Sequence, residues 1–170
     1  MAKVSTKPNK NEYQKARESL GLTREQASEL LECISAERIE RIESERYVPH
    51  PEEIMVMAEK YKAPNLCNYY CVHECSIGKQ YVPEIKIKDL SQIVLEMLAS
   101  LNSMHKKRDR LIEIAADGEI SNDEIADFIF IQDELERISI TVETLQLWAE
   151  RMLANGMIDL QKYEEIKTNN

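Results

Sequence analysis

Apolar residues along this chain recur mostly at intervals of three and four, and scarcely any stretch alternates apolar with polar residues. An α-helix turns once every 3.6 residues, so this spacing places the apolar side chains on one helical face. Only four glycines and five prolines interrupt the 170 residues, and the pattern therefore predicts an all-α protein. We expect an arm at 1–10, a compact helical domain at 11–64, a junction and connector at 65–88, a helical hairpin at 89–155 and a tail at 156–170.

The compact domain has a clear helix start at Thr23. Gln26 follows three residues later and precedes an apolar run, which is the spacing of a capping box, where each side chain bonds the backbone N–H of the other residue. Gly21, just upstream, suits the left-handed position that ends an earlier helix over 11–20. The sequence thus predicts one helix closing and another opening within a few residues.

A second helix is predicted from Ser35, an N-cap residue, to about Glu45. Its buried positions are Ile39 and Ile42, three residues apart, and Pro51 opens the helix after it. Only three or four residues, 32–34 and the cap, separate this helix from the one that Thr23 begins. Two helices this short bury little surface alone, so we expect other helices to cover them on both sides.

These residues resemble the XRE family, the helix-turn-helix proteins of the Cro and lambda repressor type. The resemblance covers roughly residues 11–64 and runs through LTREQASELL, SAERIERIE and the PHPEE segment that opens the next helix. It implies a sequence-specific transcriptional regulator that binds double-stranded DNA, with the helix from Ser35 in the major groove and the preceding cap against phosphate. The residues that it implies for DNA binding are Thr23, Arg24, Ser35, Ala36, Glu37, Arg38, Glu40, Arg41 and Arg46.

The charge of this region leaves a second interpretation open. Residues 1–50 contain nine Lys or Arg and nine Asp or Glu, whereas a surface that binds nucleic acid normally has a basic excess. The family also usually has a glycine and one residue fewer in the turn, where this chain has Glu32 and Cys33. The alternative is a protein-interaction or assembly module on a helix-turn-helix scaffold that no longer binds DNA.

The rest of the chain narrows the class of protein. Residues 51–170 hold thirteen basic and twenty-two acidic residues, which accounts for the net charge of −9 and confines any DNA contact to the N-terminal domain.

No apolar stretch approaches the roughly 20 residues that cross a bilayer, and the polar start has no signal-peptide core, so we expect a cytoplasmic protein. His50, His73 and His105 belong to no recognisable nucleophile motif, and we expect no enzyme.

Three cysteines, Cys67, Cys71 and Cys75, follow one another at spacings of four. In an unbroken helix the first and last would lie about 12 Å apart along the axis, too far for one metal. A helix that ends near Cys71 would let Cys75 fold back, so that the thiolates hold zinc or an iron–sulfur cluster. Buried structural cysteines and a thiol redox sensor are the alternatives. With the long helices after it, this junction also resembles a Gram-positive subgroup of the same family.

Two heptad stripes follow the connector, which we expect to be extended from Ser76 to Lys88. Their members step alternately by four and three and are Leu90, Val94, Met97, Leu101, Met104, Arg108, Leu111 and Ala115, then Phe128, Ile131, Leu135, Ile138, Val142, Leu145, Ala149 and Met152. The stripes predict a long antiparallel helical hairpin. Each helix has more apolar surface than one neighbour covers, so we expect two chains to form a four-helix homodimer. A monomer whose hairpin folds back on the N-terminal domain is the alternative.

Overall fold

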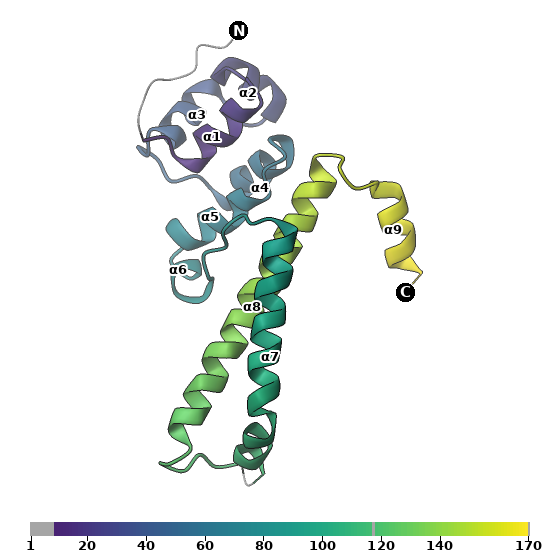
Figure 1. The fold of residues 1–170 in the computed structure, drawn as a ribbon. Helices are drawn as coiled ribbons and strands as arrows, with labels where there is room; N and C mark the ends of the chain where they lie inside the picture. The colour runs from purple at the N-terminus through teal and green to yellow at the C-terminus, as the bar shows by residue number, and fades with distance from the viewer. Residues whose placement is uncertain (1–8, 117, 170) are drawn as a thin grey trace. The chain divides into compact units, whose positions relative to one another are not determined.

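The computed structural model describes residues 9–116 and 118–169, so the predicted arm at 1–10 lies almost wholly outside the described residues. The described residues form helices and no strand (Figure 1), which confirms the predicted all-α fold. The chain divides into two compact units. One comprises Met1–Glu84 with Ala149–Asn170, and the other comprises Ile85–Trp148.

The first unit is built from short helices. They are α1 (Glu12–Ser19), α2 (Arg24–Leu31), α3 (Ala36–Glu43), α4 (Pro51–Lys60), α5 (Asn65–His73), α6 (Gly78–Tyr81) and α9 (Leu160–Thr168), and the last turns of α8 (Ile125–Ala154) also belong to this unit. The second unit contains α7 (Leu90–Ala115) and the rest of α8. The predicted tail at 156–170 contains α9, which continues to Thr168.

The core of the first unit joins α1 to α5. Its buried side chains come from every one of these helices and from the turn between α2 and α3. They are Tyr13, Ala16, Ala27, Leu31, Ile34, Ile39, Ile42, Ile54, Met57, Ala58, Tyr61 and Leu66. Because α2 and α3 share this core with α1 and α4, the two short helices are covered on both sides, as their small apolar surface requires.

The connector after α5 is not wholly extended. It contains the single-turn helix α6, which was not predicted because four residues are too few to show a helical period. Gly78 begins this helix and packs against the backbone of Cys71. A Cβ atom at position 78 would lie 2.2 Å from the carbonyl oxygen of Cys71, so only glycine allows the close approach.

The long C-terminal helix pair predicted from the sequence is present as α7 and α8, which run antiparallel (Figure 1). Near the loop that joins them, Asp127 of α8 accepts hydrogen bonds from Lys107 at 3.0 Å and from Arg110 at 2.9 Å. These two ion pairs link the helices near that loop.

Several buried residues of the two long helices directly precede a member of the predicted stripe in the sequence. The buried residues of α7 are Ile93, Ser100 and Ile114, and those of α8 include Ile131, Glu134 and Thr141. The stripe members Leu90, Val94, Leu101, Leu135 and Val142 are instead exposed. These five positions are therefore not buried within the hairpin of a single chain. Both flanks of each helix are apolar, so the heptad period alone did not determine which flank is covered.

Candidate nucleic-acid interface

The two helices of the candidate interface begin where their caps predict. Thr23 accepts a hydrogen bond from the backbone N–H of Gln26 at 3.2 Å, and the Gln26 side chain accepts one from the N–H of Thr23 at 2.9 Å. The hydroxyl of Ser35 accepts from the N–H of Arg38, also at 3.2 Å. Both N-terminal turns are thus satisfied by side chains, which fixes where α2 and α3 start.

The turn between α2 and α3 is tight although it is long for the family. The N–H of Cys33 donates to the carbonyl of Leu31 at 2.6 Å, which closes a three-residue γ-turn around Glu32. Glu32 has φ 60° and ψ −45°, a conformation that is strained for any residue with a Cβ. The longer turn thus contains a strained backbone conformation at Glu32. Ser35 still caps α3.

Helix α3 has one buried face and one open face. Ile39 and Ile42, both 1% exposed, turn into the core, as the sequence predicted. Glu37 and Arg41 are exposed on the opposite side, and Ala36, Arg38 and Glu40 are partly exposed between them. The implied base-contact positions therefore share one accessible surface, while the apolar positions anchor the helix.

Glu43, the last residue of α3, is buried between two arginines. Arg17 of α1 donates to its carboxylate through Nε at 2.5 Å and through Nη2 at 2.9 Å, and Arg24 of α2 donates at 2.8 Å. Burial alone would lower the pKa of Arg17, but its hydrogen bonds to Glu43 leave that pKa raised. The glutamate thus joins the first three helices through charge-assisted hydrogen bonds.

Arg38 is also engaged within the protein. Its Nε and Nη2 atoms donate to Glu53 of α4 at 2.8 and 2.7 Å, and its guanidinium lies 3.4 Å from the centre of the Tyr47 ring. Glu53 accepts from the N–H of His50 as well, at 2.7 Å, which caps α4. This arginine is therefore a link between α3 and α4.

The two remaining arginines of this surface form looser pairs. Arg41 donates to Glu37, one helical turn away, at 2.6 Å, and Arg46 lies 3.7 Å from Glu40. Each of the four arginines that the resemblance implies for DNA binding is therefore next to a glutamate. Sequence reasoning missed Arg17, Glu43 and Glu53 in these pairs because exposed and buried carboxylates look alike in a helical sequence.

The three cysteines of the predicted cluster, Cys67, Cys71 and Cys75, lie in and after α5. Cys67 is exposed, whereas Cys71 and Cys75 are partly buried. Helix α5 continues past Cys71 to His73, and within residues 9–116 and 118–169 no group of three or more His, Cys, Asp or Glu is arranged to hold a metal ion. The structure therefore gives no geometric support to the three-cysteine zinc or iron–sulfur site, which stays a prediction from spacing.

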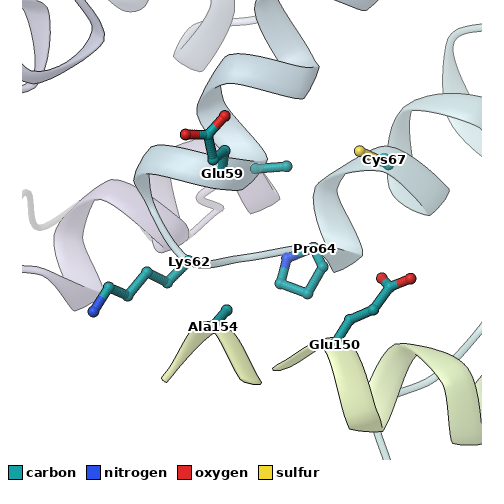
Figure 2. Close-up of a pocket in the computed structure, with 7 residues that line it drawn as sticks. Glu59, Lys62, Pro64, Cys67, Glu150 and Ala154 are labelled. Carbon is teal, nitrogen blue, oxygen red and sulfur yellow. The ribbon is translucent and has the colours of Figure 1, made fainter. Parts of the chain in front are cut away.

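A pocket of 540 Å³ lies beside Cys67, within the first unit (Figure 2). Its lining residues are Ala58, Glu59, Lys62, Pro64, Cys67, Glu150 and Ala154. Figure 2 shows the carboxylates of Glu59 and Glu150 on opposite sides, with Lys62 directed away. Burial, then the neighbouring Cys71 and Glu150, raise the pKa of the Cys67 thiol. A raised pKa disfavours the thiolate at Cys67, and the redox-sensor alternative for the cysteines stays a prediction.

A family model for helix-turn-helix proteins, HTH_3, matches residues 14–64. The match begins within α1 and ends at Pro64, so it contains both capped helices and α4. Residues 14–64 are therefore a helix-turn-helix domain of the XRE type, a class of DNA-binding regulators. No curated protein and no solved structure matched the chain. The described residues contain no helix long and apolar enough to cross a membrane.

Proposed function

We propose that the protein is a sequence-specific DNA-binding transcriptional regulator and not an enzyme. The observation that carries the proposal is the helix-turn-helix match at 14–64 together with an α3 that Ser35 caps and that has one accessible face. In this class the second helix of the pair enters the major groove. A transcriptional regulator must reach the DNA, so the proposal includes a cytoplasmic location for the protein.

In the proposed complex the accessible side chains of α3 read base edges. Arg41 suits guanine, and Glu37 or Glu40 accepts from the N4 amino group of cytosine. Thr23 and Arg24, at the start of α2, lie against the phosphate backbone. DNA phosphates would have to replace the glutamates now paired with the arginines. Breaking the ion pairs of Arg41 and Arg46 costs little free energy, because exposed ion pairs stabilise a protein by only about 0–1 kcal/mol.

The proposal includes two copies of the chain on one operator. Helix-turn-helix regulators commonly bind as dimers to half-sites about one DNA turn apart. One domain of this size, with equal numbers of basic and acidic residues in positions 1–50, makes few phosphate contacts. A pair of domains doubles those contacts without any change in the domain itself.

The protein-interaction module remains the second candidate, and one observation favours it. Arg24, Arg38, Arg41 and Arg46 all lie beside carboxylates, so the candidate surface has little net positive charge. A surface of this kind attracts phosphate weakly but suits a partner protein with mixed charge.

Fluorescence anisotropy separates the two functions. The full chain is titrated into a labelled duplex of mixed sequence at low and at moderate salt. A regulator should bind in both conditions and lose affinity as salt rises, because each neutralised phosphate contributes about −0.9 to the slope of log K against log salt. An absence of binding at low salt would contradict DNA binding and favour the interaction module.

A further inference from the structure

The pocket beside Cys67 has the size of a small-molecule site. Its volume of 540 Å³ lies within the range of about 300–1,000 Å³ that is usual for ligand pockets. Three segments of the first unit form its wall, namely the end of α4 with the turn after it, the start of α5 and the last turns of α8 (Figure 2). A small molecule in the pocket contacts all three segments at once.

Short and apolar side chains leave this space open. Ala58 and Ala154 end at Cβ, Pro64 contributes its ring, and Cys67 contributes its sulfur. Ala58 is only 8% exposed and belongs to the core that joins α1 to α5, so one side of the pocket is a packed wall. A wall of this kind suits the apolar body of an organic molecule.

The charged groups that line the pocket are mainly acidic. Glu150 is exposed and forms no ion pair or hydrogen bond with another described residue. Glu59 lies 3.7 Å from Lys60, in a pair that is open to solvent. Lys62 follows the end of α4 with φ 54°, and Figure 2 shows its side chain directed away from the pocket. The lining residues therefore place two carboxylates around an apolar space and direct their lysine elsewhere.

The negative charge of Glu150 acts on the wall of the pocket. Burial, then Cys71 and then Glu150 raise the pKa of the Cys67 thiol. A carboxylate raises the pKa of a nearby thiol because it disfavours a second negative charge, and the same field attracts a positive one. The pocket therefore favours a cation over an anion.

We propose that this pocket binds a small organic cation, in which an ammonium group is joined to an apolar body. The apolar body lies against Ala58, Pro64 and Ala154, and the ammonium group lies beside the carboxylate of Glu150. An anion is repelled by both carboxylates, and a neutral molecule gains no attraction from them. The inference goes beyond the proposed function and does not depend on DNA binding, because α3 contributes no residue to the pocket.

Three probes that share a phenyl ring and differ in charge test the proposal. They are benzyltrimethylammonium, benzyl alcohol and benzoate, each titrated into the isotope-labelled full chain and followed by the backbone amide signals in NMR spectra. Benzyltrimethylammonium should shift the signals of Cys67, Glu150 and Ala154 in a saturable way. Its affinity should exceed that of benzyl alcohol by about two- to fivefold, the range for an exposed charge pair, and benzoate should bind more weakly still.

Two variants with matched controls test the assigned groups. Glu150→Gln should remove the preference for the cation, whereas Glu136→Gln, the same change at an exposed position of α8 outside the pocket, should keep it. Ala154→Leu should fill the pocket and weaken the binding of benzyltrimethylammonium and benzyl alcohol alike. Ala99→Leu, at an exposed position of α7, should weaken neither.

Several results would overturn the proposal. They are the absence of saturable binding by benzyltrimethylammonium, shifts confined to residues away from the pocket, and equal affinity for the three probes. Unchanged binding in Ala154→Leu, or a preference for the cation that persists in Glu150→Gln, would do the same. The titrations of the wild-type chain and of Glu150→Gln, which changes one exposed side chain, decide the question even if Ala154→Leu fails to fold.

Discussion

Arg38 and Glu53 form a two-point ion pair between α3 and α4, with N–O distances of 2.8 and 2.7 Å. The side chains are only 20% and 18% exposed, and the ring of Tyr47 covers the guanidinium. The resemblance assigns Arg38 to DNA, but its pairing makes it a residue that positions α3. Arg41, one turn along the same helix, has an exposed pair and remains available for a ligand.

The first prediction separates these two arginines. Arg38→Ala should destabilise the domain by about 1–3 kcal/mol, because it leaves the Glu53 carboxylate without its main partner. Arg41→Ala should change stability by less than about 0.5 kcal/mol, since it removes one exposed pair within a helix. Urea unfolding of both variants measures the difference.

DNA affinity should rank the same variants in the opposite order. Under conditions where both are folded, Arg41→Ala should weaken binding by about 1–3 kcal/mol, the range for a lost contact to a base. Arg38→Ala should retain more of the affinity. Equal stability of the two variants, with DNA binding lost only in Arg38→Ala, would reverse the assigned roles.

The second prediction concerns Glu43, whose side chain is 1% exposed between Arg17 and Arg24. Glu43→Ala should destabilise the domain by about 3–5 kcal/mol, because it removes the main partner of the buried Arg17 charge and leaves only Glu18, at 3.8 Å, as a carboxylate nearby. Glu37→Ala is the control on the same helix, and its exposed carboxylate should contribute less than about 0.5 kcal/mol. Similar urea midpoints for the two variants would show that the buried network does not stabilise the domain.

The sequence predicted what local chemistry determines. Caps at Thr23 and Ser35 and the buried positions Ile39 and Ile42 follow from neighbouring residues, and the structure has all of them. Glu43 and Glu53 were not predicted as buried or half-buried partners, because their roles depend on residues far away in the chain. Ion pairs of this kind decide which arginines stay free, so the site was predicted less completely than the fold.

The long helices show a second limit of prediction from sequence. Their existence follows from the heptad period, but the period is the same for two neighbouring flanks of one helix. The covered flank includes the polar residues Ser100, Glu134 and Thr141, so the apolar pattern alone does not identify it. The metal prediction failed to gain support for a related reason, since spacing along a helix does not bring thiols together.

The third prediction concerns acid. The hydrogen bonds from Arg38 lower the pKa of Glu53 below its usual 4.5. A carboxylate with a lowered folded-state pKa contributes its full stabilisation above the unfolded value, and the contribution is lost as pH falls through the folded value. The domain should therefore lose stability below about pH 4.5. Thermal unfolding between neutral and acidic pH measures the loss, and Glu53→Gln should make it smaller. An equal loss in both proteins would assign it to other groups.

The fourth prediction uses the strained turn. Glu32 holds φ 60° and ψ −45°, and the hydrogen bond from Cys33 to Leu31 closes around it. Glycine adopts such a conformation without steric cost, so Glu32→Gly should stabilise the domain by about 1 kcal/mol and raise its melting temperature. The gain is smaller than the full strain, because glycine also gains entropy in the unfolded chain.

Glu29→Gly supplies the matched control for this turn. Glu29 is exposed within α2, three residues earlier, and glycine there should destabilise the helix by about 1 kcal/mol. Opposite signs for the two substitutions would locate the effect in the backbone of the turn, because both remove the same charge. If both variants melt lower than the wild type, Glu32 is not strained, and the extra residue of the turn is accommodated elsewhere. DNA binding by Glu32→Gly then tests whether a relaxed turn still presents α3, since Ser35 and its cap are unchanged.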